Sequence, residues 1–349
     1  MLVSQRFLVS SFLVLFTVLS LLLLAFSVQA SESDAVASRT ESQSIIIQDS
    51  EKSYRFDTVP KRIAVLGWDL AEQLLELDVT PIAMPEIDDY HTWVVQPRVP
   101  VGVEDLGLRA EPNLEKLAAL KPDLIIMANR QRDLKARLLR IAPVLYFQTY
   151  SKDHNNAEAA IQTYRTLAKL LKKEALAEQK LQQMQTRIQQ LKDQLQQAYG
   201  EQLPKVSTLR FASTTSVYLY GENSIAQYAL NQLGIDAALP QPSNQWGITQ
   251  TRVLNLRAAG QDTVLYFKPF EQEKQLKKSP LWQAMPFVRA GRTNSIRSTW
   301  TYGGAMSIGY MADALAASLL EIAPHPIAHN AVYPAVYKAE DNGREQIKP

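Results

Sequence analysis

The side chains that most often hold metals or act as nucleophiles are scarce in this sequence. It contains no cysteine and four histidines, His91, His154, His325 and His329. Only His325 and His329 lie close together, in a proline-rich stretch, and a metal site needs three or more convergent ligands. The lack of cysteine excludes disulfide scaffolds, thiolate zinc sites, iron–sulfur clusters and cysteine nucleophiles. We therefore expect no resident metal and no cofactor.

Motifs for catalysis and nucleotide binding are also missing. There is no GxxxxGK[ST] loop, no GxGxxG after a strand, no GxSxG elbow and no conspicuous acid–base pair. The 37 Lys and Arg residues nearly balance the 35 Asp and Glu residues, whereas proteins that bind nucleic acid carry a clustered basic footprint. The sequence therefore predicts neither an enzyme nor a nucleic-acid partner.

The N-terminus carries the features of an export signal. Arg6 precedes an apolar run from Phe7 to Val28, and residues 28–30 read VQA, a small-x-small pattern. This pattern predicts a signal peptide over residues 1–30, cleaved after Ala30. The alternative is an uncleaved anchor, because about 20 apolar residues can span a bilayer. Because no cysteine follows for a lipid anchor, and export without disulfides fits a periplasm, we expect the periplasm of a Gram-negative bacterium.

The elements that must position any site alternate between strand and helix. Residues 31–55 form a polar segment, of which 31–52 are predicted to be disordered. Short apolar runs of strand type then alternate with helical patterns over residues 56–173, and the pattern resumes over 201–323, where Thr251–Ala259 is predicted to be helical. With 349 residues, the chain is long enough for two domains. We therefore predict two α/β lobes with central, largely parallel sheets, followed by a loose tail over residues 324–349.

The middle of the chain is helical. Residues 156–199 contain no glycine or proline and are rich in strong helix formers. We predict helices over about Ala157–Lys172 and Glu174–Tyr199, and the second would be about 39 Å long at 1.5 Å per residue. Such a helix, assigned to residues 174–200, is long enough to link the two lobes. The alternative, a coiled-coil arm, has only two to three heptads of support.

Two stretches resemble a known family. Residues 107–126 read GLRAEPNLEKLAALKPDLII, and residues 279–292 read SPLWQAMPFVRAGR, continuing to TWTYGG at 299–304. They resemble the periplasmic ferric-hydroxamate (ferrichrome-type) binding proteins of ABC importers, within the helix-linked class of substrate-binding proteins. The resemblance covers about residues 60–322. It implies a ligand cleft between two lobes joined by one long helix, and a monomer that delivers a ferric siderophore to an inner-membrane permease with its ATPase.

The resemblance assigns the polar anchor of the cleft to Arg109. In the family, the matching arginine hydrogen-bonds the oxygens that ligate the iron, and a guanidinium offers forked donors to such oxygens. The alternative is a surface arginine paired with Glu111. The iron itself is expected to be held by the siderophore and not by the protein.

Aromatic residues that line the family's cleft have matches in both predicted lobes, in segments rich in turn or polar residues. The matching positions are Trp93, Trp246, Trp300 and Tyr302. A mostly apolar pocket with few polar anchors suits the organic shell of a siderophore, although core packing is the alternative for each. Asn244 is an additional polar contact in this prediction, whereas Trp68 and Trp282 are predicted to be structural.

This sequence departs from the family at two places. Gln131 stands where the family has a tyrosine, flanked by Arg130 and Arg132, and Ile248 replaces a small polar residue. Two added arginines would suit an anionic carboxylate or mixed-ligand complex better than a neutral tris-hydroxamate, but solvated loop charges are an equal alternative. We include all three of residues 130–132 among the ligand-binding candidates.

Docking to the permease in this family uses an acidic residue on each lobe. Glu115 matches the first, and the corresponding helix of the second lobe, TRVLNL, has no acid. The wider fold also serves haem and cobalamin, which stay as further alternatives for the ligand. An esterase acting on the siderophore would need a nucleophile and a base that the sequence does not offer.

Overall fold

The computed structural model of the chain describes residues 44–325. The predicted signal peptide and all but the first two residues of the predicted tail 324–349 lie outside this range. Among the described residues, no helix combines the length and the apolar character needed to cross a membrane.

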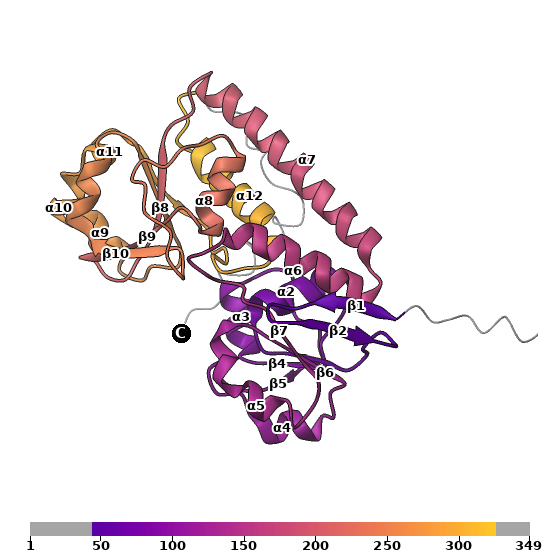
Figure 1. Ribbon diagram of the computed structural model, residues 1–349. Coiled ribbons are helices and arrows are strands. Elements are labelled where there is room, and N and C mark those ends of the chain that lie inside the picture. Colours follow the sequence, from indigo (N-terminus) through magenta and orange to yellow (C-terminus); the bar gives the residue numbers. More distant parts are fainter. Residues whose placement is uncertain (1–43, 326–349) are drawn as a thin grey trace, which may run out of the picture. The chain divides into compact units, whose positions relative to one another are not determined.

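The first lobe is built on a five-stranded sheet in which every pair of neighbours is parallel (Figure 1). The spatial order is β5-β4-β3-β6-β7. Because the inner strands are apolar and fully buried, the sheet must be covered on both faces. The strands are β3 (Ile63–Val65), β4 (Ala83–Met84), β5 (Glu104–Asp105), β6 (Leu124–Met127) and β7 (Val144–Tyr146).

Short helices connect these strands. All nine residues of α2 are buried, so this helix lies inside the molecule and not on its surface. The connections are α2 (Trp68–Glu76), α3 (Ile87–Trp93), α4 (Leu114–Ala119), the 3₁₀ helix η1 (Asn129–Leu134) and α5 (Lys135–Leu138).

A β-hairpin precedes this lobe where the sequence predicted disorder. Strands β1 (Ile45–Gln48) and β2 (Ser53–Phe56) pair antiparallel. Ile45 and Ile47 are buried in the main core, and the carboxylate of Asp49 accepts a hydrogen bond from the Tyr146 amide at 3.0 Å. The prediction of disorder over residues 31–52 is therefore wrong from Ile45 onward, because the alternating burial of a three-isoleucine run outweighs the polar residues around it.

Two long helices follow the first lobe. Asn155 caps α6 (Asn156–Leu171) by accepting hydrogen bonds from two amides of its first turn, and Lys172 ends it with a left-handed backbone. The 26-residue α7 spans Glu174–Tyr199, as predicted, and packs against both α6 and α12. Its buried stripe is Ala177, Leu181, Met184, Ile188, Leu191, Leu195 and Ala198.

The second lobe has a mixed sheet with the order β10-β9-β8-β11-β12. Its β8, β11 and β12 are parallel, whereas β9 and β10 extend the sheet in antiparallel fashion. The strands are β8 (Val206–Phe211), β9 (Ser216–Tyr220), β10 (Ile248–Arg252), β11 (Thr263–Phe267) and β12 (Thr293–Ile296). The predicted helix over Thr251–Ala259 thus begins as the end of β10 and continues as a 3₁₀ helix.

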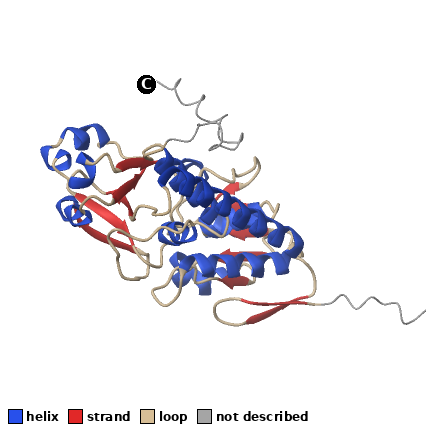
Figure 2. Ribbon diagram, turned by 90° about the horizontal axis from the view of Figure 1, so that it is seen from above, coloured by secondary structure: helices blue, strands red, loops and turns tan. Residues whose placement is uncertain are grey.

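Helices lie over both sheets (Figure 2). Those of the second lobe are α8 (Ile225–Gln232), η2 (Val253–Ala259), α9 (Glu273–Lys278), α10 (Pro280–Gln283), α11 (Pro286–Arg289) and α12 (Ser307–Leu320). The α/β fold with two sheets and a linking helix matches the architecture predicted from the sequence.

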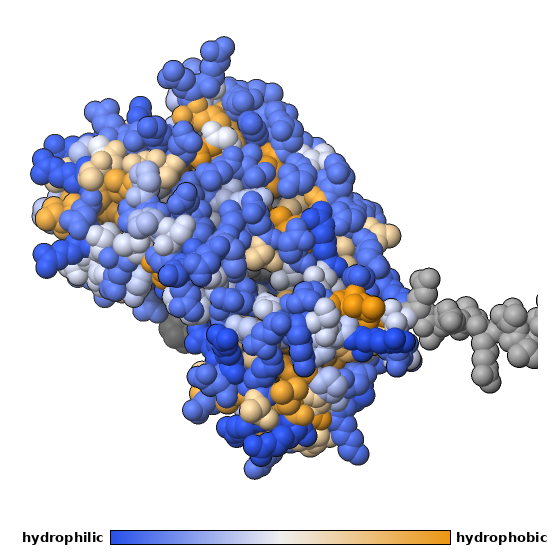
Figure 3. All heavy atoms as spheres, viewed as in Figure 1, coloured by the Kyte–Doolittle hydropathy of each residue, from blue (hydrophilic) through white to orange (hydrophobic). Residues whose placement is uncertain are grey.

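The two lobes share their largest core, and each also has a smaller core of its own. The largest cluster of buried apolar residues runs from β3 through α6 and α7 into α12, and the described residues from Ile45 onward form a single compact unit. The face shown in Figure 3 is mainly hydrophilic, with apolar residues in scattered places. The largest core is continuous because α7 buries one stripe against helices of both lobes.

Candidate ligand-binding cleft

A cavity of about 450 Å³ lies between the two lobes. Of its 22 lining residues, 11 come from positions before residue 151 and 11 from positions after 209. Most of them lie at or shortly after the ends of β3, β6, β7, β8, β11 and β12, the carboxyl ends where open α/β sheets bind ligands. The lining residues are Gly67, Trp68, Asp69, Trp93, Arg109, Ala128, Asn129, Arg130, Gln131, Thr149, Tyr150, Arg210, Phe211, Tyr220, Trp246, Phe267, Lys268, Pro269, Thr299, Trp300, Thr301 and Tyr302.

Aromatic side chains make up nine of these 22 residues. The four predicted aromatics all line the cavity, and Trp93 and Trp246 remain 42% and 40% exposed. The rings contact one another across the lobes, because the Trp68 and Trp300 centroids lie 5.2 Å apart and those of Tyr150 and Tyr302 lie 5.5 Å apart. Such walls offer large apolar contact area with little side-chain entropy to lose.

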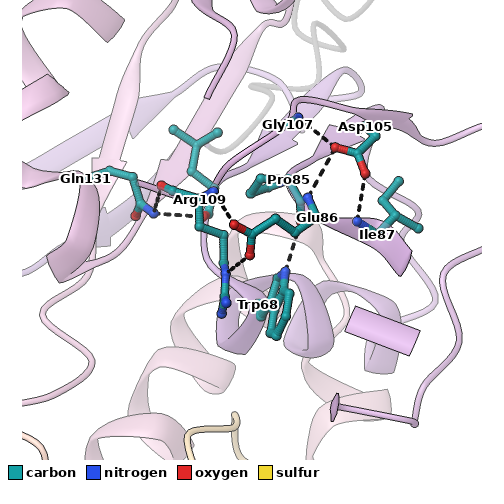
Figure 4. Close-up of polar contacts among 9 residues, drawn as sticks. Trp68, Pro85, Glu86, Ile87, Asp105, Gly107, Arg109 and Gln131 are labelled. Atoms are coloured by element: carbon teal, nitrogen blue, oxygen red, sulfur yellow. Dashed lines mark hydrogen bonds and ion pairs between the residues drawn. The ribbon is translucent and has the colours of Figure 1, made fainter. Parts of the chain in front are cut away.

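Arg109 lies in the loop between β5 and α4, where its side chain is held on two sides (Figure 4). Its guanidinium carbon lies 3.3 Å from the centre of the Trp68 ring, and its Nε donates to Glu86 Oε2. Burial lowers the pKa of Arg109 while Glu86 raises it, and an arginine stays protonated in either case. No described residue accepts a hydrogen bond from the two terminal nitrogens, so these donors are available to a ligand.

Glu86 is itself fixed by a second carboxylate. Its backbone is left-handed, with φ of 53°, a conformation that costs a residue with a side chain about 1 kcal/mol. Asp105 stabilises this turn by accepting hydrogen bonds from the amides of Glu86, Ile87 and Gly107 at 2.7–3.2 Å. The Arg109 amide then donates to Glu86 Oε1 at 3.0 Å. The orientation of the arginine is therefore set before any ligand arrives.

Gln131, one of the predicted contacts, lies in the wall of the cavity with 1% of its surface exposed. Its amide nitrogen donates to the backbone oxygens of Leu66 at 3.0 Å and Arg109 at 2.9 Å. Its side-chain oxygen accepts from the Ala128 amide at 3.3 Å. The side chain therefore joins the ends of two strands to the arginine loop, and its hydrogen-bonding groups are engaged within the protein.

The two flanking arginines are placed differently. Arg130 is exposed and lines the cavity, with no ion pair to a described carboxylate. Arg132 is outside the lining, and its guanidinium lies 5.7 Å from the centre of the Tyr146 ring. Arg130 therefore belongs to the cleft, whereas Arg132 packs near Tyr146 outside it.

Asn244 is also outside the lining and shapes the loop that presents Trp246. Its side-chain oxygen accepts hydrogen bonds from the amides of Trp246 and Ile248 at 3.0 and 3.2 Å. Its side-chain nitrogen donates to the Ile248 oxygen at 2.8 Å. Here the predicted ligand contact is a residue that holds the loop in shape.

Several lining residues were not singled out from the sequence. Trp68, expected to be structural, supports Arg109 with its ring face while its Nε1 donates to the Pro85 oxygen at 2.9 Å. Tyr150, Arg210 and Lys268 also line the cavity but lie in no motif. Each of them comes at or just after the end of a strand, and the rule that clefts form at the carboxyl ends of strands would have found them.

Titratable groups in the cleft carry a cationic excess. Arg109, Arg130, Arg210 and Lys268 line it against the single carboxyl of Asp69. Burial raises the pKa of Asp69 to about 6, partly offset by hydrogen bonds with Thr149 and with the backbone; the four cations outnumber this carboxyl group even when it is ionised. Among residues 44–325, no three His, Asp or Glu side chains gather to hold a metal.

The predicted docking residue lies outside the cleft. Glu115 is exposed in the first turn of α4, where a carboxylate is favoured by the helix dipole. Its helix is held by Asn113, whose side chain accepts from the Lys116 amide at 2.8 Å.

Comparison with known proteins gives concordant matches. The family model described as "Periplasmic binding protein" matches residues 63–299. The chain is 32% identical to the iron(3+)-hydroxamate-binding protein FhuD of Escherichia coli, over 71% of this chain and 83% of that protein. It is 27% identical to the Fe(3+) dicitrate-binding periplasmic protein FecB of the same organism, over 80% and 90%.

A solved structure is also similar. The siderophore-binding protein FhuD of Vibrio cholerae, bound to Fe3+-Desferal, superposes with a TM-score of 0.75 and 56% sequence identity. The match covers 76% of this chain and 99% of that one. The family model spans more than half of the chain and the fold agrees, so the protein belongs to the periplasmic binding protein family.

Proposed function

We propose that this protein captures a ferric siderophore, most simply a ferric hydroxamate, and delivers it to an ABC importer for iron uptake. The observation that carries the proposal is Arg109, which directs free guanidinium donors into a cavity walled by nine aromatic side chains. The 56% identity to a protein bound to Fe3+-Desferal supports the same ligand class.

The chemistry of the ligand fits this arrangement. Three hydroxamates neutralise the iron, leaving oxygens with partial negative charge on one side of an apolar organic shell. The forked donors of Arg109 can hydrogen-bond those oxygens, and the aromatic walls cover the shell. The protein needs no metal ligands of its own, because the iron enters already chelated.

A second candidate ligand class is an anionic ferric chelate with carboxylate or mixed ligands. It is favoured by Arg130, Arg210 and Lys268, which line the cavity without an ion pair to a described carboxylate. Similarity to the dicitrate-binding protein FecB is in line with this class. Since exposed charges contribute about 1 kcal/mol or less each, we expect them to adjust the preference among ligands and not to replace the aromatic contacts.

The setting of this function is the periplasm. The export signal predicted over residues 1–30, with cleavage predicted after Ala30, and the family membership support that location. We propose that the monomer docks onto an inner-membrane permease, whose ATPase drives transport, and that exposed Glu115 is part of the docking surface. The protein would act by binding and release, without catalysis.

Titration of tryptophan fluorescence tests the proposal. A panel of ferric hydroxamates, ferric carboxylates and the corresponding iron-free ligands should give saturable quenching, strongest for one ferric class. Haem and cobalamin, titrated by absorbance, are the control ligands. Absence of a response to every ferric siderophore, or tighter binding of haem or cobalamin, would refute the proposal.

Two neighbouring substitutions separate the ligand classes. Arg130→Ala should weaken anionic chelates by about threefold to fivefold, in keeping with the small contribution of an exposed charge, and should leave neutral chelates unchanged. Arg132→Ala is the matched control, because Arg132 has the same charge two positions away but does not line the cavity. Equal losses for neutral and anionic chelates would argue against the anionic class.

A further inference from the structure

Helix α2 carries two buried carboxyl groups that the cleft chemistry does not use. Glu72 is 0% exposed and Glu76 is 6% exposed. They lie one and two turns beyond Trp68, the first residue of the helix, which lines the cleft. Buried carboxyl groups are costly unless they are hydrogen-bonded, so the partners of these two show what they stabilise.

The partners of Glu72 all belong to the other lobe. One carboxyl oxygen accepts from the Gly304 amide at 3.0 Å and the Ser307 hydroxyl at 2.8 Å. The second oxygen accepts from the Ser307 amide at 2.9 Å. Helix α12 begins at Ser307, and its own N-cap residue, Met306, provides no side-chain cap. Glu72 therefore caps α12 from across the lobe boundary, satisfying amides that the helix cannot satisfy itself.

The same carboxyl group holds the end of a cleft segment. Residues 299–304 run between β12 and α12 and contribute Trp300 and Tyr302 to the cavity. This segment presses directly on α2, since a Cβ on Gly304 would lie 2.4 Å from Gln73 Cγ and 2.9 Å from the Asp69 oxygen. A glycine is required here for space, because a larger residue would push the segment away.

We propose that Glu72 is a positioning residue for ligand binding, which fixes segment 299–304 so that Trp300 faces Trp68 and Tyr302 faces Tyr150 across a preformed cleft. The inference rests on the proposed function for its binding readout only. A segment ordered in advance loses less conformational freedom when ligand binds, so affinity rises without any new contact to the ligand. Glu72 itself does not line the cavity.

Binding by Glu72 variants is the first arm of the test. Glu72→Ala should raise the Kd for a ferric hydroxamate by about tenfold or more, because several side chains must then be ordered on binding. Glu72→Gln keeps an oxygen for the Gly304 amide and the Ser307 hydroxyl, and should recover most of the affinity. The matched control is Glu76→Gln, one turn further from the cleft, where the partners are Tyr310 and Lys180. This control should change Kd by less than about twofold.

Near-ultraviolet circular dichroism is the second arm and needs no ligand. The Trp68 and Trp300 rings lie 5.2 Å apart, close enough to produce a coupled signal. Trp300→Phe removes one of the two rings and so shows which part of the spectrum is the coupled signal. Glu72→Ala should diminish that signal, whereas Glu72→Gln should keep most of it. Loss of stability without a change of ring geometry would leave the signal of the folded protein intact.

The outcomes separate this inference from the proposed function. If Glu72→Ala leaves both Kd and the tryptophan signal as in Glu76→Gln, the positioning role is refuted. If the wild type binds no ferric siderophore, the proposed function fails, while the dichroism arm still decides on Glu72. Should Glu72→Ala not fold, Gly304→Ala displaces the same segment by steric contact with α2 and is expected to give the same two changes.

Discussion

The two walls of the cleft are built on different principles. In the first lobe, Asp105 accepts a hydrogen bond from the Glu86 amide, Glu86 accepts one from the Arg109 amide, and Gln131 donates one to the Arg109 backbone oxygen. In the second lobe, the wall is mainly aromatic, and Trp246 remains 40% exposed on a loop. Directional hydrogen bonding requires fixed donors, whereas apolar contact requires only area.

This difference predicts unequal tolerance to substitution. A forked donor displaced by a fraction of an ångström loses hydrogen-bond geometry, but a ring that shifts by the same amount still excludes water. We therefore expect the first wall to determine which ligand binds and in which orientation. The second wall should determine how much of the ligand is covered.

Removing the side chain of Arg109 should produce the largest change in Kd. Arg109→Ala is expected to raise the Kd of a ferric hydroxamate by about 100-fold, since a hydrogen bond to a charged group contributes about 1.5–3 kcal/mol. Arg109→Lys keeps the charge without the fork and should recover only part of the loss. Fluorescence titration measures both, and a full rescue by lysine would show that charge alone suffices.

Weakening the ion pair that orients Arg109 should raise the Kd less than removing Arg109. Glu86→Gln weakens the ion pair that orients Arg109 and should raise Kd by about tenfold, because the partly buried guanidinium loses its charged partner. Thermal unfolding should shift downward at the same time. The exposed pair of Arg165 and Glu178 is a control, and Glu178→Gln should change neither quantity appreciably.

The aromatic wall should respond more gently. Trp246→Ala is expected to raise Kd by about fivefold and Trp246→Phe by less than twofold, since only part of a half-exposed ring's area is lost. Isothermal calorimetry measures the change. A loss as large as that of Arg109→Ala would mean that the second wall also contributes a directional contact.

Loosening the loop of the second wall should have a smaller effect still. Asn244→Ala removes three hydrogen bonds within the loop, but Trp246 can still reach the ligand, so Kd should rise by about threefold or less. Combining it with Trp246→Ala checks the mechanism. If Asn244 acts only through Trp246, the double variant should bind no more weakly than Trp246→Ala.

The stability that Glu72 contributes at the contact between the lobes should depend on pH. Burial raises the pKa of Glu72 to about 8, hydrogen bonds from Gly304 and Ser307 lower it and the charge of Glu76 raises it further. The folded protein therefore holds a proton that the unfolded chain releases near the ordinary value of 4.5. Stability from this group is complete below that value and falls as pH rises through about 8, by at most about 1.4 kcal/mol per pH unit.

Thermal unfolding between pH 5 and 9 measures this effect. The midpoint of the wild type should fall by several degrees relative to that of Glu72→Gln as the pH rises, since the variant has no carboxyl group to ionise. Parallel curves for the two proteins would show that Glu72 does not titrate in this range.

Much of the fold could be predicted from local pattern. Helix α7 matched its predicted bounds because residues 156–199 lack glycine and proline, and its stripe from Leu181 to Leu195 repeats every three or four residues. The β1–β2 hairpin was missed because strands of four residues carry little periodic signal. Its burial depends on α6, which is more than 100 residues further along the chain.

The candidate site was also only partly predictable from the sequence. Arg109 and the aromatics lie in recognisable motifs, and the structure brings them together around one cavity. For Gln131 and Asn244 the residue was identified but its contacts were not, because local sequence cannot say whether an amide side chain faces a ligand or a backbone group. Tyr150 and Arg210 lie in no motif and become neighbours of the cleft only when two sheets align their strand ends.

The sequence by itself determined the alternation of strands and helices and the long helix, because these depend on neighbours a few residues apart, and its resemblance to a known family implied the chemical character of the cleft. Only the tertiary structure decided that Glu72 caps a helix 235 residues away, that Glu86 orients Arg109, and that the lobes share their largest core. Those contacts arise from burial. A carboxyl group removed from water must find donors wherever packing places them, and the distance along the chain carries no information about where that is.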